Sequence, residues 1–327
     1  MMAKVMRVRE IPILLALIVL LLLTGILNPA FRTGDGMTAI LVESALIGFL
    51  AVGQTNLIIM RHIDLSVSST AGLVSFLVGN YSANHGGVTG GVALAIALGV
   101  GAAVGIVNGA LVAFLGLPSL VVTIGTLYIV RGIFNYLASG ITVTADQLPP
   151  YFSWLGSGSI LGIPDLFLIA VVGAAIMTLV LRYTRWGRDL YAIGSNPQAA
   201  RRVGIPVPSR EFAAFVLNGC IAGIAGLMLL SRFSFADATS GLGIELYVVA
   251  ACVIGGVAIA GGVGTPAGAL IGAVLLQTIA FALGALGVSQ FWQQAVAGAL
   301  LVVAIAFDRI VAMRSTHRAT RLVEVPV

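Results

Sequence analysis

Charged residues are scarce in this chain. Asp, Glu, Lys and Arg make up 9% of its 327 residues, whereas 59% are hydrophobic. Soluble domains carry about 25% charged residues, and a single core cannot hide so much apolar side chain, because surface grows too fast relative to volume. The composition therefore excludes a soluble enzyme, a disordered chain and a nucleic-acid binder, and it predicts a protein that lies in lipid.

Lysine and cysteine are almost absent. Lys4 is the only lysine, so a phosphate-binding loop of the form G-x-x-x-x-G-K-[ST] cannot occur beyond the N-terminus. The two cysteines, Cys220 and Cys252, both lie in apolar runs, where they are expected to pack as small hydrophobic residues. Two such cysteines exclude a secreted disulfide scaffold, and we expect no metal site and no cofactor.

Long stretches without charge define the expected fold. A membrane helix needs about 20 mainly apolar residues. Turn signals divide the charge-free runs 65–130 and 246–307 into two or three spans each. Further spans are expected at 11–27, 38–60, 166–181 and 212–231. The sequence predicts an all-α integral membrane protein of about ten transmembrane helices, with some broken or re-entrant segments, over residues 1–312, followed by a tail at 313–327.

The basic residues orient this arrangement. With ten spans, fourteen of the seventeen Lys and Arg residues fall on one side, six of them in the loop between spans six and seven. Cytoplasmic loops carry an excess of Lys and Arg. Both termini and that loop are therefore predicted to be cytoplasmic.

Glycines mark close packing or a break. Gly101, Gly105 and Gly109 recur at helical spacing and predict a flat strip for packing against another helix. A second group is too dense for a stable helix, and it is interpreted equally well as a hinge, as pathway lining or as close packing. This group comprises Gly255, Gly256, Gly261, Gly262 and Gly264.

Ionisable residues inside the spans suggest two classes of function. Glu43, Asp64, Arg131 and Glu245 either bind ions that drive a secondary transporter, or they serve structure and pathway while another subunit supplies the energy. Arg61 lies three residues before Asp64 and could pair with it. Alternatively, Asp64 marks a broken segment that faces the pathway.

The loop at about 184–210 carries a short helix. Asn196 is a good N-cap, Pro197 suits the first helical position and Gly204 suits the residue after the helix, which predicts a helix over 197–203. Such a helix, with Ala199 and Ala200 on it, has the shape to dock in a groove of another protein. A basic loop that rests on anionic lipid is the alternative.

Four motifs together resemble one family. They are 63–67 (Ile-Asp-Leu-Ser-Val), 118–132 (Pro-Ser through Arg-Gly), 187–205, and 253–265 (Val-Ile-Gly-Gly through Gly-Gly-Val-Gly-Thr). Over approximately residues 10–312 the chain resembles the membrane permease subunits of bacterial ATP-binding-cassette (ABC) importers for monosaccharides, of the ribose, rhamnose and autoinducer-2 type. Many relatives have glycine where this chain has His62 and Ser68. The pair Arg61 and His62 resembles the rhamnose and autoinducer-2 branch.

The resemblance implies a permease in the bacterial inner membrane that is not itself an enzyme. Its expected partners are an ABC ATPase subunit, a second permease subunit that is identical or paralogous, and a periplasmic sugar-binding protein. The ATPase would dock on the cytoplasmic coupling loop. The matching residues there are Gly187, Arg188, Tyr191, Gly194, Asn196, Pro197, Ala199, Ala200, Arg201 and Gly204.

Five neutral polar residues and Asp64 are the expected pathway lining, since neutral polar groups suit sugar hydroxyls and few strong contacts allow release. They are Asn56, Asp64, Ser66, Asn108, Thr123 and Thr126. Two other substrate and energy assignments stay open: a branched-chain amino acid permease of the same wider family, and an ion-coupled secondary transporter.

Uptake into membrane vesicles separates the two energy sources. We expect that an imposed proton or sodium gradient drives no uptake in the absence of ATP and partner subunits. Gradient-driven uptake by this chain alone would contradict the ABC interpretation.

Overall fold

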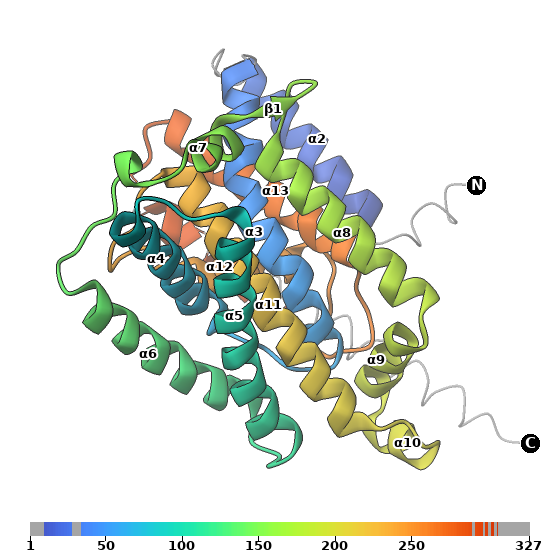
Figure 1. The fold of residues 1–327 in the computed structure, drawn as a ribbon. Helices are drawn as coiled ribbons and strands as arrows, with labels where there is room; N and C mark the ends of the chain where they lie inside the picture. Colours follow the sequence, from blue (N-terminus) through green and yellow to red (C-terminus); the bar gives the residue numbers. More distant parts are fainter. Residues whose placement is uncertain are drawn as a thin grey trace, which may run out of the picture.

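The chain folds into a bundle of helices (Figure 1). The structure is a computed structural model, and it describes residues 10–27, 34–289, 292–296, 298–299, 302–303 and 306. Its elements are α2 (Glu10–Leu27), α3 (Gly34–Ile59), α4 (Val67–His85), α5 (Gly90–Ala113), α6 (Ser119–Ala138), η2 (Ala145–Gln147), α7 (Pro150–Ser157), β1 (Ser159–Ile160), β2 (Ile163–Pro164), α8 (Asp165–Tyr183), α9 (Arg185–Ser195), α10 (Pro197–Arg202), α11 (Val207–Phe233), α12 (Ile244–Ile254) and α13 (Pro266–Ala285).

Six of these helices are long and apolar enough to cross a membrane, namely α3, α5, α6, α8, α11 and α13. The apolar parts of α2 and α12 are shorter. Apart from the two-residue strands β1 and β2, which pair antiparallel, the predicted all-α class is confirmed. The number ten stays a prediction, because the last expected span falls on a stretch that is described only in part. The predicted tail at 313–327 lies outside the described residues.

Helices α3 and α11 form the centre of the bundle. Two-thirds (67%) of the apolar window of each is buried, against 22% for α5 and 28% for both α6 and α8. The last three therefore turn broad apolar faces outward, as helices in contact with lipid do. The predicted glycine strip of α5 packs on α11: a Cβ on Gly101 would overlap the Gly219 carbonyl, and one on Gly105 would lie 2.5 Å from the Phe215 carbonyl oxygen.

The two ends of the bundle are distinct. Helices α9 and α10 lie at the end where α3 finishes, and α7 with β1 lies at the other (Figure 1). At that second end Val143 forms a β-bridge with Ala236. The six arginines of residues 182–210 therefore lie at one end of the bundle. Arg232 lies at the opposite end, in the last turn of α11. This distribution agrees with the predicted orientation.

The sequence predicts a break in the glycines after α12. The structure has a further irregular stretch, not predicted from the sequence, between α11 and α12. From Ala236, whose bridge partner Val143 packs on Gly79, the segment runs along α4 until the Ser240 carbonyl reaches Gly72. Gly79 and Gly72 are seven residues apart on α4, so this segment covers about 10 Å along that helix. α12 then adds 11 residues, about 16 Å, so neither part spans a bilayer alone.

A buried arginine supports this non-helical backbone. The Arg131 guanidinium of α6 donates through Nη1 to the carbonyl oxygens of Ser240 (3.0 Å) and Ala238 (3.4 Å), and it lies 5.4 Å from the ring centroid of Phe134. Irregular backbone at membrane depth persists only where its polar groups are satisfied inside the protein. Arg131, which the sequence marks as an intramembrane charge, has this structural role.

The close contact between α5 and α11 predicts a position-dependent cost for a single methyl group. Gly105→Ala is expected to lower the free energy of unfolding by about 1–3 kcal/mol, because overpacking shifts the backbone. Gly99→Ala, on the same helix with no atom within 4 Å of the new Cβ, is expected to be neutral or stabilising, since alanine favours a helix by about 1 kcal/mol. Denaturation of the purified protein in detergent measures both, and equal effects would contradict the packing.

Candidate functional site

Helices α9 and α10 are set by local capping. The Thr184 hydroxyl accepts a hydrogen bond from the Gly187 amide (3.1 Å) and caps α9. The Asn196 side chain accepts from the amides of Gln198 (3.1 Å) and Ala199 (3.0 Å) and caps α10. The predicted cap and short helix are confirmed. The helix ends at Arg202, one residue earlier than expected.

The predicted coupling-loop residues divide into two faces. Gly187, Gly194 and Ala200 are buried against the rest of the chain, and Tyr191 and Pro197 are half-buried. The others are exposed: Arg188, Asn196, Ala199, Arg201 and Gly204. One face is therefore available for a partner, while the other contacts the bundle.

The inward face meets the end of α3, and we call this contact the coupling junction (Ile59, Arg61, Tyr191, Gly194, Ser195 and Gly261–Gly264). Arg61 donates through Nε to the Gly194 carbonyl (2.7 Å) and through Nη2 to the Ser195 carbonyl (2.9 Å). These carbonyls end α9, where a cation is also favoured by the helix dipole.

The glycine-rich turn after α12 completes the junction. The Gly262 amide donates to the Ile59 carbonyl (2.8 Å), and the Tyr191 hydroxyl donates to the Gly264 carbonyl (2.7 Å). A Cβ on Gly194 would overlap the Ile59 carbonyl oxygen. Three segments far apart in sequence thus meet through their backbones, with no room for a side chain between them.

The glycines of this turn are packed rather than open. Gly256, Gly261, Gly262 and Gly264 all have positive φ, which residues with a side chain rarely adopt. Gly255 lies so close to α13 that a Cβ would overlap the Gly268 carbonyl. In this structure Gly255, Gly261, Gly262 and Gly264 are closely packed, and a role as a hinge or as pathway lining stays a prediction.

Arg61 does not pair with Asp64, contrary to one expectation from their spacing. Arg61 has φ +71° and lies in a tight turn after α3, not in a helix, so the geometry of an i, i+3 pair does not apply. Its guanidinium turns toward α9, and the Asp64 carboxylate turns inward to neutral partners.

Asp64 is the centre of a buried polar cluster (Gln54, Asp64, Ser66, Asn108 and Asn218), each member of which is at most 2% exposed. Asp64 accepts at Oδ1 from the amide (2.9 Å) and hydroxyl (2.6 Å) of Ser66, and at Oδ2 from Asn218 Nδ2 (3.0 Å). Asn108 Nδ2 donates to the Ser66 hydroxyl (2.9 Å). In the amide orientation that satisfies both groups, Gln54 pairs with the backbone of Asp64. The cluster thus joins α3, α4, α5 and α11.

The predicted pathway residues are therefore only partly brought together. Asp64, Ser66 and Asn108 share the cluster. Thr123 lies beside it and donates to the Ile63 carbonyl (3.2 Å). Asn56 and Thr126 donate to the backbone of their own helices.

Two cluster members, Gln54 and Asn218, were missed by the sequence analysis. The signal that could have found them is an amide inside a long apolar run, since such groups need a buried partner. Within the described part of the chain, no three His, Cys, Asp or Glu side chains gather closely enough to hold a metal ion.

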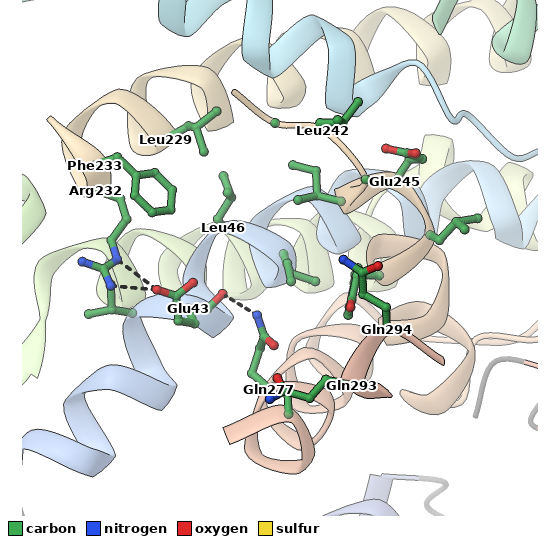
Figure 2. A pocket seen from close by; sticks show the side chains of 18 of the residues that line it. Glu43, Leu46, Leu229, Arg232, Phe233, Leu242, Glu245, Gln277, Gln293 and Gln294 are labelled. Atoms are coloured by element: carbon green, nitrogen blue, oxygen red, sulfur yellow. Dashed lines mark hydrogen bonds and ion pairs between the residues drawn. The ribbon is translucent and has the colours of Figure 1, made fainter. Parts of the chain in front are cut away.

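A cavity of about 1060 Å³ opens at the end opposite α9 (Figure 2). It is lined by α3, α11, α12, α13 and residues near 293–298. Glu43 in this cavity accepts from Nε (3.2 Å) and Nη2 (2.7 Å) of Arg232. None of the six predicted pathway residues lines it. Glu43 and Glu245 are marked by their charge in the sequence, but the ion pair with Arg232, 189 residues away, could not be inferred.

Comparison with known proteins identifies relatives over nearly the whole chain. Residues 36–305 match the family described as "Branched-chain amino acid transport system / permease component". The chain is 34% identical over 300 residues to the autoinducer 2 import system permease protein LsrC of Shigella flexneri, covering 92% of this chain and 86% of that protein. It is 33% identical to LsrC of Escherichia coli strain K12 / DH10B, with the same coverage. No solved structure matches.

The buried cluster predicts a large cost when one donor is removed. Asn218→Leu leaves the buried Asp64 carboxylate with one hydrogen bond fewer, and we expect the free energy of unfolding to fall by about 1.5–3 kcal/mol. Asn135→Leu makes the same change on the exposed face of α6 and is expected to change stability by about 0.5 kcal/mol or less. Chemical denaturation in detergent compares the two, and an equal effect would show that the cluster does not stabilise the fold.

Proposed function

This chain belongs to the branched-chain amino acid transport system permease family, and from that premise we propose that it is the membrane subunit of a bacterial ABC importer for a monosaccharide or similar polyol. A separate ATPase subunit would hydrolyse ATP, a periplasmic binding protein would deliver the solute, and a second permease, identical or paralogous, would complete the transporter in the inner membrane. Both termini would be cytoplasmic. The chain itself would carry out no chemical reaction.

The observation that carries this proposal is the coupling junction. The α9–α10 segment has an exposed face with Arg188, Ala199 and Arg201 and a buried face that touches α3 and the turn before α13. A loop that only rested on lipid would not need a buried face joined to the bundle by direct backbone contacts. The arrangement is suited to a segment that is displaced by a partner subunit and transmits this displacement to the helix bundle.

A series of direct contacts links α9 to the central helices. Movement of α9 displaces Ile59 and Arg61, because no side chain separates Gly194 from them. Three residues after Arg61, Asp64 is held by Asn218 of α11 and, through Ser66, by Asn108 of α5. The α3–α4 turn would therefore carry motion from the partner into the central helices.

The substrate class rests on the pathway chemistry and on the printed names of the relatives. Uncharged hydroxyls and amides suit a sugar, and the relatives are named for import of autoinducer 2. We propose that Asn56, Asp64, Ser66, Asn108, Thr123 and Thr126 border the pathway once the α3–α4 turn has moved. The family description names branched-chain amino acids, which keeps an amino-acid permease as the second candidate. Ligand binding by the cognate periplasmic protein, across pentoses, deoxyhexoses and branched-chain amino acids, decides between them.

Two variants should separate docking from transmission. Ala199→Asp places a charge on the exposed face and is expected to abolish co-purification with the ATPase. Gly194→Val acts inside the junction, so it should keep co-purification but reduce solute uptake per ATP hydrolysed at least about tenfold, because α9 is displaced from α3 by overpacking.

Gly125→Val is the matched control for the second variant, since nothing lies within 4 Å of a Cβ there. It should leave uptake per ATP unchanged. Normal coupling in Gly194→Val, or the same loss in Gly125→Val, would contradict transmission through the junction.

A further inference from the structure

The cavity at the outer end lies where the chain leaves regular helix. It is lined by Gly243, Ile244 and Glu245 at the start of α12, by Glu43 of α3 and by Gln277 of α13. Its volume of about 1060 Å³ is slightly larger than the range for small-molecule sites, about 300–1,000 Å³. Discontinuous helices form the binding sites of many transporters, because their ends expose polar backbone to the solute.

The positive charges at this cavity are already engaged by the protein. Arg232 places two nitrogens on Oε1 of Glu43. Arg131 does not line the cavity, and it donates to the carbonyls of Ala238 and Ser240. Among the described residues that line the cavity, the carboxylate of an amino acid or of an acidic sugar would find no free guanidinium, and it would face two carboxylates. Anionic groups are therefore disfavoured.

Groups that can hydrogen-bond to hydroxyls remain available. No hydrogen bond within the described residues engages the Glu245 carboxylate, and Gln277 uses only its amide nitrogen, which donates to the Glu43 carbonyl (3.3 Å). Figure 2 shows Glu43, Glu245, Gln277 and Gln294 around the same space. Carboxylate oxygens accept strong hydrogen bonds from hydroxyl groups. The rings of Phe233 and Tyr247 line the cavity too and offer flat apolar faces to the C–H side of a sugar ring.

Apolar residues dominate the lining, but a lipid chain would leave its few polar side chains without a hydrogen-bonding partner. The polar side chains would lose water without gaining a partner against an acyl chain, and such burial is costly. Leu242 lines the cavity and is 67% exposed, which makes it a suitable position for a chemical probe.

Resting on the proposed function, we infer that this cavity binds the transported solute and selects an uncharged polyol, with Glu245 and Gln277 as its hydrogen-bonding residues. The solute occupies the cavity after release by the binding protein and before the α3–α4 turn moves. Glu43 and Arg232 form an ion pair, so the positive charge of Arg232 is neutralised within the cavity.

Labelling of a single introduced cysteine tests this assignment. In right-side-out membrane vesicles that contain the assembled transporter, Leu242→Cys is labelled with a membrane-impermeant maleimide, with the parent chain as background for Cys220 and Cys252. A panel of uncharged pentoses, hexoses and deoxyhexoses is expected to include at least one sugar that slows labelling. L-leucine and D-gluconate should not slow it.

Adding Glu245→Gln should weaken that protection about tenfold, since one hydrogen bond to a charged group is lost. Asp146→Asn makes the same carboxylate-to-amide change at an exposed position outside the cavity and should leave protection intact. Equal labelling rates without sugar show that each variant is folded. The inference would be overturned if leucine protects the cysteine or if no sugar does. It would also be overturned if only added phospholipid changes the labelling rate, or if Glu245→Gln and Asp146→Asn have equal effects.

The proposed function fails on a different result. If sugar protects the cysteine in assemblies that carry Leu242→Cys alone, but these assemblies take up sugar without ATP, the cavity assignment stands and the importer proposal falls. If ATP-driven uptake is normal and no solute protects the cysteine, the importer proposal stands and the cavity assignment falls.

Discussion

The close approach of Gly194 to the Ile59 carbonyl is the constraint on which the rest of the structure depends. A single methyl group would not fit there, so the end of α9 packs directly on the end of α3. Arg61 reinforces the contact with two hydrogen bonds to the carbonyls of Gly194 and Ser195. The Gly262 amide adds a third segment through the same Ile59 carbonyl. Helices α9 and α10 are thereby connected to two separate parts of the bundle at one point.

From this point the connection to the core is short and polar. A carboxylate at 2% exposure is stable only where donors surround it. The donors around Asp64 come from the start of α4 and from α11, and through Ser66 the cluster extends to α5. α11 ends beside the outer cavity with Arg232. A movement of the α3–α4 turn therefore bears on the helix that borders both the cluster and the cavity.

Local signals in the sequence predicted local structure well. Asn196 and Pro197 specify the start of α10, and the strip from Gly101 to Gly109 specifies the face of α5 that meets α11. Signals that depend on chain topology were harder to interpret. The spacing of Arg61 and Asp64 suggested a helical ion pair, but the left-handed turn at Arg61 sends the two side chains in opposite directions. The partners Glu43 and Arg232 are 189 residues apart, and only the fold brings them together. The start of α12 at Ile244 follows from the packing of Ser240 on Gly72, which no periodicity in the sequence records.

The ratio of solute taken up to ATP hydrolysed is the quantity that tests transmission through the junction most directly. Arg61→Met removes both hydrogen bonds to α9 while keeping an unbranched side chain in the turn. In proteoliposomes with the assembled transporter, we predict that ATP hydrolysis stays within about twofold of wild type. Uptake per ATP should fall at least about tenfold, because the two hydrogen bonds that join Arg61 to the end of α9 are lost. An unchanged ratio would show that α9 does not transmit motion through the end of α3.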